Sequence, residues 1–181
     1  METVIFVLKA LRDFLDDLIE KLIIEEKPVM PNLPAIDSSK TSPNQSSRDD
    51  TKIDLIVLHN TDGTIDGAID HFSKQSSQVS AHYLVSREGD LYRMVPEHRK
   101  AWHARQENSR SIGIEIEAYA SRTGMTTAQN SAVVALVRDI QKRLGLTNEQ
   151  VGVHRQFCNT DCPVHIWPTD SDFNEWKGKF L

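Results

Sequence analysis

Hydrophobic and polar positions divide the chain into three regions. In residues 1–26 apolar side chains return every three or four positions, which predicts one amphipathic helix with a heptad seam. In residues 27–50 no apolar period survives and four of the seven prolines fall there, so this segment is predicted to be an extended or disordered linker. From residue 51 onward short apolar runs alternate with helical spacings, which predicts a folded domain over residues 51–181.

The wide apolar stripe of residues 1–26 needs a surface that covers it. Packing against the chain's own domain, self-association and docking to a delivery partner are all open from the sequence. Binding to a membrane surface is the least favoured alternative, because the segment holds seven acidic residues against three basic ones.

The domain is predicted to mix strands and helices. Runs that are rich in β-branched residues or that alternate predict strands at residues 53–59, 80–86, 91–95, 111–118 and 151–154. Helical spacing predicts helices at residues 64–75, capped by Thr64, at 126–144, closed by Gly145, and around Phe173, Trp176 and Phe180. The second and third strands form a hairpin whose turn contains Gly89. One hairpin together with helical crossovers predicts an α/β fold, with a mixed central β-sheet flanked by helices.

Composition narrows the functional classes. The chain carries 21 basic and 26 acidic residues, and this net charge of −5 argues against a general binder of nucleic acid or anionic membranes. Two cysteines are too few to staple a small secreted scaffold, so the fold is expected to depend on its core. No segment has the pattern of a signal peptide or of a membrane-spanning helix.

Three residues at or after strand ends point to a metal site. His59 ends a buried strand and His154 ends a short one, although either histidine alone is more often structural. Cys162 follows His154 by eight residues, and two imidazoles with a thiolate are a zinc-type ligand set that leaves a fourth position for water. Cys158 lies four residues before Cys162 and offers a competing interpretation, as a disulfide partner or an alternative ligand.

Six motifs then follow one another along the domain: IVLHNT, VSAHYLVSREGDLYRMVPE, AWHA, NSRSIGIEIE, VGVHR and TDCP. They span about residues 56–163, and in this combination the sequence resembles the zinc-dependent N-acetylmuramoyl-L-alanine amidases. That family includes phage T7-type lysozyme, bacterial AmpD-like enzymes and animal peptidoglycan recognition proteins.

The resemblance implies roles for individual residues. By motif position, His59, His154 and Cys162 match the zinc ligands of the family. Glu115, in SIGIE, matches the catalytic base of AmpD-like members. His103, in AWHA, matches a recurrent family histidine near the substrate, so it is expected to bind substrate or to stabilise an oxyanion.

The strand pattern around Glu115 supports its role. On a strand, Gly113, Glu115 and Glu117 share one face and the intervening isoleucines share the other. One face is therefore apolar, and the other carries two carboxylates. Motif position favours Glu115 as the base, which leaves Glu117 as an exposed neighbour or a substrate contact.

Several positions depart from the family pattern. Cys162 stands where AmpD-like members have aspartate, and Thr160 stands where they have lysine, so this loop is similar to that of the recognition proteins. Ala81 occupies the place of a tyrosine that other members use, and Tyr83, two residues on, is expected to share its strand face. Val164 replaces a glycine that often follows the proline.

The sequence does not give a single catalytic or metal-binding role to Trp102 or to the other four histidines. Trp102 is either a core residue or a platform for a sugar. His82 is expected to support the site or to belong to the sheet. His71, His98 and His165 are expected to be solvated surface histidines without a role.

The resemblance implies a peptidoglycan hydrolase that cleaves the amide between N-acetylmuramic acid and L-alanine of the stem peptide with zinc-activated water. Glu115 would transfer the proton, and Thr160 or His103 would help zinc to stabilise the oxyanion. The alternatives are a peptidoglycan-binding module without catalysis, a cytosolic enzyme that recycles muropeptides, and a protein directed by a partner through residues 1–26.

The sequence also raises the question of how the protein reaches its substrate. Peptidoglycan lies outside the cytoplasmic membrane, and no export signal is visible in the sequence. An endolysin released through a separate pore or an injected effector would fit this combination. A cytosolic recycling enzyme would also fit, but it would not need the N-terminal helix and linker.

Overall fold

The computed structural model describes residues 11, 12, 14, 15, 18 and 31–181. The chain forms two compact units, Met1–Met30 and Pro31–Leu181. In the first unit the described residues are helical, and the side chains of Leu11, Phe14, Leu15 and Leu18 are exposed. The rest of the predicted helix over residues 1–26 lies outside the described residues. No helix in the described part of the chain is both long enough and apolar enough to cross a membrane.

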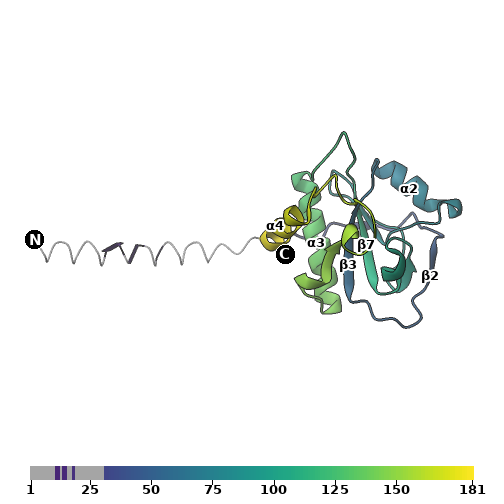
Figure 1. Cartoon of the computed structure of the whole chain (residues 1–181), viewed down its shortest axis with the longest axis horizontal. Helices are drawn as coiled ribbons and strands as arrows, with labels where there is room; N and C mark the ends of the chain where they lie inside the picture. Colours follow the sequence, from purple (N-terminus) through teal and green to yellow (C-terminus); the bar gives the residue numbers. More distant parts are fainter. Residues whose placement is uncertain (1–10, 13, 16–17, 19–30) are drawn as a thin grey trace, which may run out of the picture. The chain divides into compact units, whose positions relative to one another are not determined.

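The domain is built on a six-stranded mixed sheet (Figure 1). In spatial order its strands are β1 (Ile36–Asp37), β5 (Leu91–Arg93), β4 (Tyr83–Val85), β7 (Ser111–Ile116), β3 (Leu55–Asn60) and β8 (Val151–Val153). β4 and β5 are antiparallel, as the predicted hairpin requires, and the other pairs are parallel. A separate two-stranded ribbon joins β2 (Gln45–Ser47) to β6 (Arg99–Ala101). The predicted mixed α/β architecture is confirmed.

Three α-helices in the described part of the domain begin at threonine caps. They are α2 (Ile65–Ser73), α3 (Thr127–Leu144) and α4 (Asp170–Phe180), and the side chains of Thr64, Thr126 and Thr169 each accept a backbone N–H of the first turn. Gly145 ends α3 at a φ of 69°, a left-handed conformation that favours glycine. Short 3₁₀ helices lie at η1 (Gln75–Ser77), η2 (Arg105–Ser109), η3 (Asn148–Gln150) and η4 (His154–Gln156).

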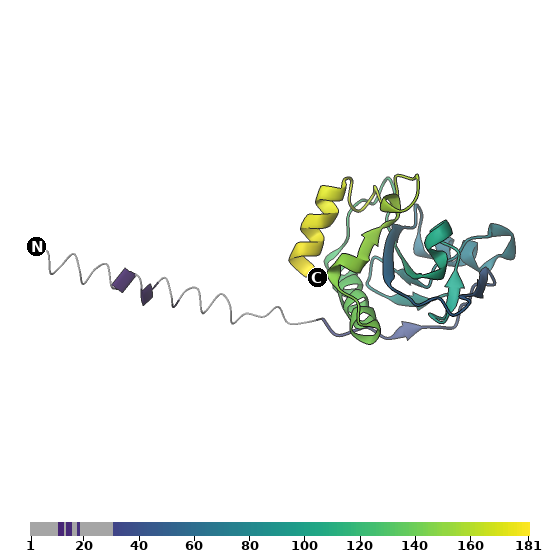
Figure 2. The same ribbon diagram turned by 60° about the horizontal axis from the view of Figure 1, so that its bottom comes forward.

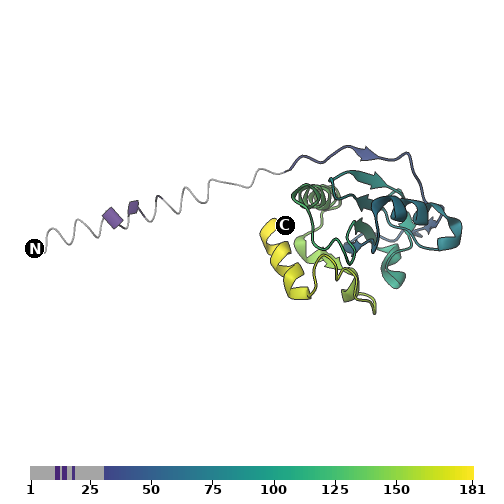
Figure 3. The ribbon, with the colours of Figure 1, turned by 90° about the horizontal axis from the view of Figure 1, so that it is seen from above.

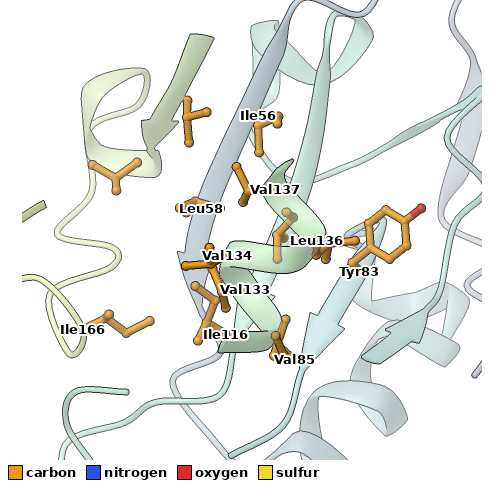
Figure 4. Close-up of a cluster of buried hydrophobic side chains, with 14 of the residues drawn as sticks. Ile56, Leu58, Tyr83, Val85, Ile116, Val133, Val134, Leu136, Val137 and Ile166 are labelled. Carbon is orange, nitrogen blue, oxygen red and sulfur yellow. The ribbon is translucent and has the colours of Figure 1, made fainter. Parts of the chain in front are cut away.

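Helices cover both faces of the sheet. On one face α3 and α4 enclose the main core; α4 lies beside α3 in all three ribbon views (Figures 1, 2 and 3). Figure 4 shows α3 lying over the strands, with Val133, Leu136 and Val137 facing apolar residues that include Ile56 and Leu58. On the opposite face α2 packs Ala68 and Phe72 against residues next to and within β4. The regular alternation of β3 buries Ile56 and Leu58 in the main core, and Leu55 and Val57 in a small separate cluster with Ala104.

The predicted linker over residues 27–50 is wrong from Pro31 onward. β1 extends the main sheet, and β2 pairs with β6, so this segment belongs to the domain. Arg48 is buried and donates to the backbone carbonyls of Glu97, Asn108, Ser109 and Ser111. Asn44 is also buried, and its amide donates to the carbonyls of Lys74 and Val79. Polar anchors rather than an apolar period hold the segment, so hydrophobic patterning could not detect it.

Candidate active site

The carboxyl ends of parallel strands meet at one edge of the sheet, and the predicted ligands gather there. His59 lies near the end of β3, His154 follows β8 directly, and β3 pairs with β8. Cys162 reaches the same edge from the loop beyond η4, with its Sγ 3.9 Å from Nδ1 of His59. One ligand atom from each of these three residues lies within 4.8 Å of the others.

This donor set fits a zinc ion. Zn–N bonds near 2.1 Å and Zn–S bonds near 2.3 Å place tetrahedral ligand atoms about 3.5 Å apart, close to the observed sulfur–nitrogen distance. Burial, and next the charge of Glu115, raise the pKa of the Cys162 thiol to about 12. A thiolate at this position therefore needs a cation beside it, and two neutral imidazoles with a thiolate are ligands that zinc accepts.

Backbone contacts hold the cysteine loop against the strand end. The backbone N–H of Asn60 donates to Sγ of Cys162 at 3.4 Å, which ties the loop to the residue after His59. The Thr160 hydroxyl accepts the backbone N–H of Cys162 at 3.2 Å. Thr160 therefore shapes the loop that presents the cysteine, and its own O–H hydrogen remains available to another acceptor.

Glu115 lies beside this ligand group. It is the register partner of His59 across β3 and β7, and its Oε1 is 3.9 Å from Nδ1 of His59. The carboxyl group is buried, and burial raises its pKa to about 8. Its Oε2 has no hydrogen-bond partner among the described residues. When this group is ionised, its buried carboxylate has a free oxygen next to a metal-type site, which is the arrangement of a proton acceptor.

Comparison with known proteins identifies the family. A family model described as N-acetylmuramoyl-L-alanine amidase, Amidase_2, matches residues 49–165, a range that includes the three candidate ligands and Glu115. The chain belongs to this amidase family.

Relatives and solved structures agree with this assignment. The chain is 35% identical over 108 residues to N-acetylmuramoyl-L-alanine amidase A of Achromobacter lyticus, a match over 59% of this chain and 57% of that enzyme. It is 32% identical over 126 residues to the 1,6-anhydro-N-acetylmuramyl-L-alanine amidase AmpD of Salmonella typhimurium, covering 55% of this chain and 67% of AmpD. The endolysin amidase LysCS of Clostridium intestinale has a similar fold, with a TM-score of 0.66 and 26% identity over 82% of this chain and 97% of that one. The chain thus spans little more than half of the Achromobacter enzyme.

His103 contacts His59, one of the three candidate metal ligands. Its Nδ1 is 3.0 Å from Nε2 of His59, and its Nε2 is 3.1 Å from Oγ of Ser111. Both ring nitrogens therefore face protein groups, and neither is open to a substrate in this structure. The motif AWHA indicated that His103 belongs to the site, but its partner Ser111 received no role from the sequence.

Glu117 is not an exposed neighbour of Glu115. It is 4% exposed, and its carboxylate accepts the backbone N–H of Arg87 at 3.1 Å. The regular part of β7 ends at Ile116, and the side chain of Gln129 from α3 covers the following residue by donating to the carbonyl of Glu117. The alternation of the strand predicted a shared face with Glu115, but the loops that cover its end were not visible in the sequence.

Tyr83 does not take the place of the family tyrosine. Ala81 lies in the α2 layer, whereas Tyr83 lies in the α3 layer, so the expectation of a shared face is wrong. The regular strand β4 begins only at Tyr83, and the alternation does not extend back to Ala81. The Tyr83 hydroxyl donates to the carboxylate of Glu97 at 2.7 Å, within an ion pair that includes Arg143.

The two cysteines have separate environments. Both are free thiols, so the alternative of a Cys158–Cys162 disulfide is wrong for this structure. Cys158 packs against a small apolar cluster of Leu55, Val57 and Ala104, and it is not among the grouped ligands.

The other histidines also find partners. His82 is buried in the sheet, where its Nδ1 accepts the backbone N–H of Gly113 at 2.9 Å. His165 is half-buried and lies 3.1 Å from the carboxylate of Asp62, and its backbone N–H donates to the side chain of Asn60. It thus joins the loop after His59 to the loop after Cys162, a role that the sequence did not indicate. His71 and His98 are exposed, as expected.

A groove of about 410 Å³ adjoins the loop that carries His103. Its lining includes Lys100, Trp102 and Arg105, together with Ser46 from the strand β2. The Trp102 indole donates to Oγ of Ser46 at 3.1 Å, which fixes the ring at the groove wall. Neither Lys100 nor Arg105 forms a salt bridge with any residue that the structure describes. Burial, and next the charge of Arg105, lower the pKa of His154.

Proposed function

We propose that this chain is a zinc-dependent amidase that hydrolyses the bond between the lactyl group of N-acetylmuramic acid and L-alanine of the peptidoglycan stem peptide. The observation that carries the proposal is the buried Glu115 carboxylate, free of hydrogen bonds at Oε2 and 3.9 Å at Oε1 from Nδ1 of His59. A proton acceptor beside a three-ligand metal site is the arrangement that metal-assisted hydrolysis of an amide uses.

The roles of the residues follow from their positions. His59, His154 and Cys162 would hold the ion, which supplies a Lewis acid for the scissile carbonyl and lowers the pKa of a water ligand to about 7. Glu115 takes a proton from the attacking water and returns it to the leaving amine of L-alanine. The Thr160 hydroxyl oxygen accepts the backbone N–H of Cys162, so its hydrogen is still free. Thr160 donates this hydrogen to the developing oxyanion.

The groove beside His103 suits the peptide part of this substrate. Lys100 and Arg105 offer two cations without carboxylate partners among the described residues, and the stem peptide carries free carboxylates. The fixed indole of Trp102 adds a flat apolar wall. We infer that the stem peptide runs along this groove while the sugar remains on the other side of the reacting bond.

The experiment that tests the function compares two substrates. Zinc-loaded protein is incubated with intact sacculi and with soluble muropeptides, and the released peptide is quantified, with Glu115→Gln as the matched inactive variant. Hydrolysis of both or of sacculi alone supports a wall-degrading enzyme, which would act after release or injection. Preference for soluble muropeptides alone supports the recycling alternative. Binding of sacculi without release of peptide supports the non-catalytic module and contradicts the proposal.

The N-terminal unit is proposed to mediate association. Leu11, Phe14, Leu15 and Leu18 expose between 41% and 63% of their surface, and Leu11, Leu15 and Leu18 follow the heptad seam of the sequence. In the full chain, replacing Leu11 and Leu15 by serine should lower the mass measured by sedimentation equilibrium toward that of a single chain. An unchanged mass would leave these leucines without a role in self-association.

A further inference from the structure

A chain of side chains continues from the metal-type site into the protein. Nε2 of His59, the ring nitrogen that points away from Cys162, lies 3.0 Å from Nδ1 of His103. Nε2 of His103 lies 3.1 Å from Oγ of Ser111, and that hydroxyl donates to the backbone carbonyl of Glu107 at 2.6 Å. The three contacts form one continuous path that ends on a group fixed in the backbone.

The carbonyl at the end of this path sets the direction of every hydrogen bond in it. A carbonyl oxygen only accepts, so Ser111 uses its hydrogen there and its oxygen must accept from Nε2–H of His103. A neutral imidazole with a proton on Nε2 has a lone pair on Nδ1, which therefore accepts from Nε2–H of His59. His59 is then left with its lone pair on Nδ1, the atom that lies next to Cys162 and Glu115.

His103 is held firmly enough to impose this order. The amide oxygen of Asn108 accepts the backbone N–H groups of both His103 and Ala104, at 3.0 and 2.6 Å. The ring lies directly on Gly113, where a Cβ atom would come within 2.5 Å of the imidazole.

We propose that His103, together with Ser111, is a positioning residue that fixes the tautomer and the orientation of His59, so that Nδ1 is presented to the metal ion. This inference deepens the proposed metal site and assigns His103 no contact with substrate. Partners that orient a ligating histidine typically change metal affinity by about 10- to 100-fold when they are removed.

The test begins with the full-length wild-type protein without metal. Long-range ¹⁵N–¹H correlation spectra of its histidine rings report which nitrogen of His59 carries the proton. The proposal expects the proton on Nε2 of His59 and on Nε2 of His103. A proton on Nδ1 of His59 would overturn it, and this measurement does not depend on any variant being folded.

Variants then test the consequence for metal binding by competition with a zinc chelator. His103→Phe keeps a ring on Gly113 without its nitrogens, and we expect about 10- to 100-fold weaker zinc binding. Ser111→Ala should introduce the Nδ1–H tautomer of His59 and weaken binding, whereas Ser111→Thr keeps the hydroxyl and should restore both. The control His71→Ala removes an exposed histidine and should change neither.

Unchanged zinc affinity and an unchanged His59 tautomer in both His103→Phe and Ser111→Ala would overturn the inference. If activity fell in that case, His103 would act on the substrate instead. A protein with the expected tautomer and zinc affinity but without hydrolysis would contradict the proposed function and leave this inference standing.

Discussion

His59 and Glu115 are register partners on the parallel strands β3 and β7, with Oε1 of Glu115 3.9 Å from Nδ1 of His59. Because side chains alternate between the two faces of a strand, a shift of one residue in this pairing would move Glu115 to the opposite face of the sheet. The pairing of two buried strands therefore fixes the distance between a candidate metal ligand and the candidate base.

The first prediction concerns Glu115. Glu115→Gln keeps the size of the side chain but removes the proton acceptor, so hydrolysis of muropeptides should fall by about 10²- to 10⁴-fold while zinc remains bound. Peptide release and zinc content, measured on the same sample, check this. The control Glu88→Gln alters an exposed carboxylate in the β4–β5 turn and should keep full activity. Full activity in Glu115→Gln would mean that another group accepts the proton.

The second prediction concerns proton release at Cys162. Burial and the charge of Glu115 raise the pKa of this thiol to about 12, so near pH 7.5 the metal-free protein holds its proton and zinc binding must expel it. Cys162→Asp supplies a ligand that is normally ionised already, and it should release about one proton fewer per zinc. Calorimetry in buffers with different ionisation enthalpies measures this number.

The matched control for that experiment is the other cysteine. Cys158 lies outside the ligand group, so Cys158→Ala should release as many protons as the wild type and should bind zinc equally well. If Cys158→Ala lost zinc while Cys162→Asp and Cys162→Ala kept it, the sulfur ligand would be Cys158 and not Cys162.

The third prediction compares two glycines. A Cβ at Gly113 would lie 2.5 Å from the His103 ring, so Gly113→Ala should destabilise the domain by about 1–3 kcal/mol and should weaken zinc binding. Gly178 lies in α4 with no atom within 4 Å of an added Cβ, so Gly178→Ala should stabilise the domain by up to about 1 kcal/mol. Chemical denaturation of both variants gives the change in the free energy of unfolding for each. Equal changes in the two variants would contradict the close packing of His103 on Gly113.

The fourth prediction concerns acid stability and His82. Burial, and next the charge of Arg48, lower the pKa of His82 from 6.5 to about 3. The unfolded chain therefore binds a proton that the folded chain rejects, and stability that is fully present above pH 6.5 is lost as the pH falls toward 3. The contribution is about 1.4 kcal/mol per pH unit within that window. His82→Asn keeps an acceptor for the N–H of Gly113 but does not titrate, so its free energy of unfolding should fall less steeply between pH 6 and pH 4 than that of the wild type.

Much of this architecture is predictable from the sequence because its signals are local. The β-branched run around His59 predicted a buried strand. Apolar spacing predicted α2 and α3, together with the cap at Thr64 for α2 and the closing Gly145 for α3. The grouping of His59 and His154 was predictable because both stand at strand ends, and parallel strands bring such ends together. The motif order supplied the choice of Glu115, which the strand alternation alone could not separate from Glu117.

The parts that could not be predicted depend on contacts between distant residues. Arg48 secures the first segment of the domain, residues 31–50, through carbonyls of four residues that lie between 49 and 63 positions away. The partner of His103 is a serine at the start of β7, whose importance depends on the direction of a hydrogen bond to Glu107. Neither relationship leaves an apolar period or a spacing in the sequence.

The proposed cleavage between N-acetylmuramic acid and L-alanine is tested most directly by identifying the product. Sacculi are digested with the zinc-loaded wild-type protein, and the soluble fragments are identified by mass spectrometry together with labelling of new amino groups. We expect stem peptides that begin with a free L-alanine amino group, released in equal number to newly exposed lactyl carboxyl groups on the glycan. Fragments cut within the glycan or within the peptide, or binding without any new L-alanine amino terminus, would contradict it.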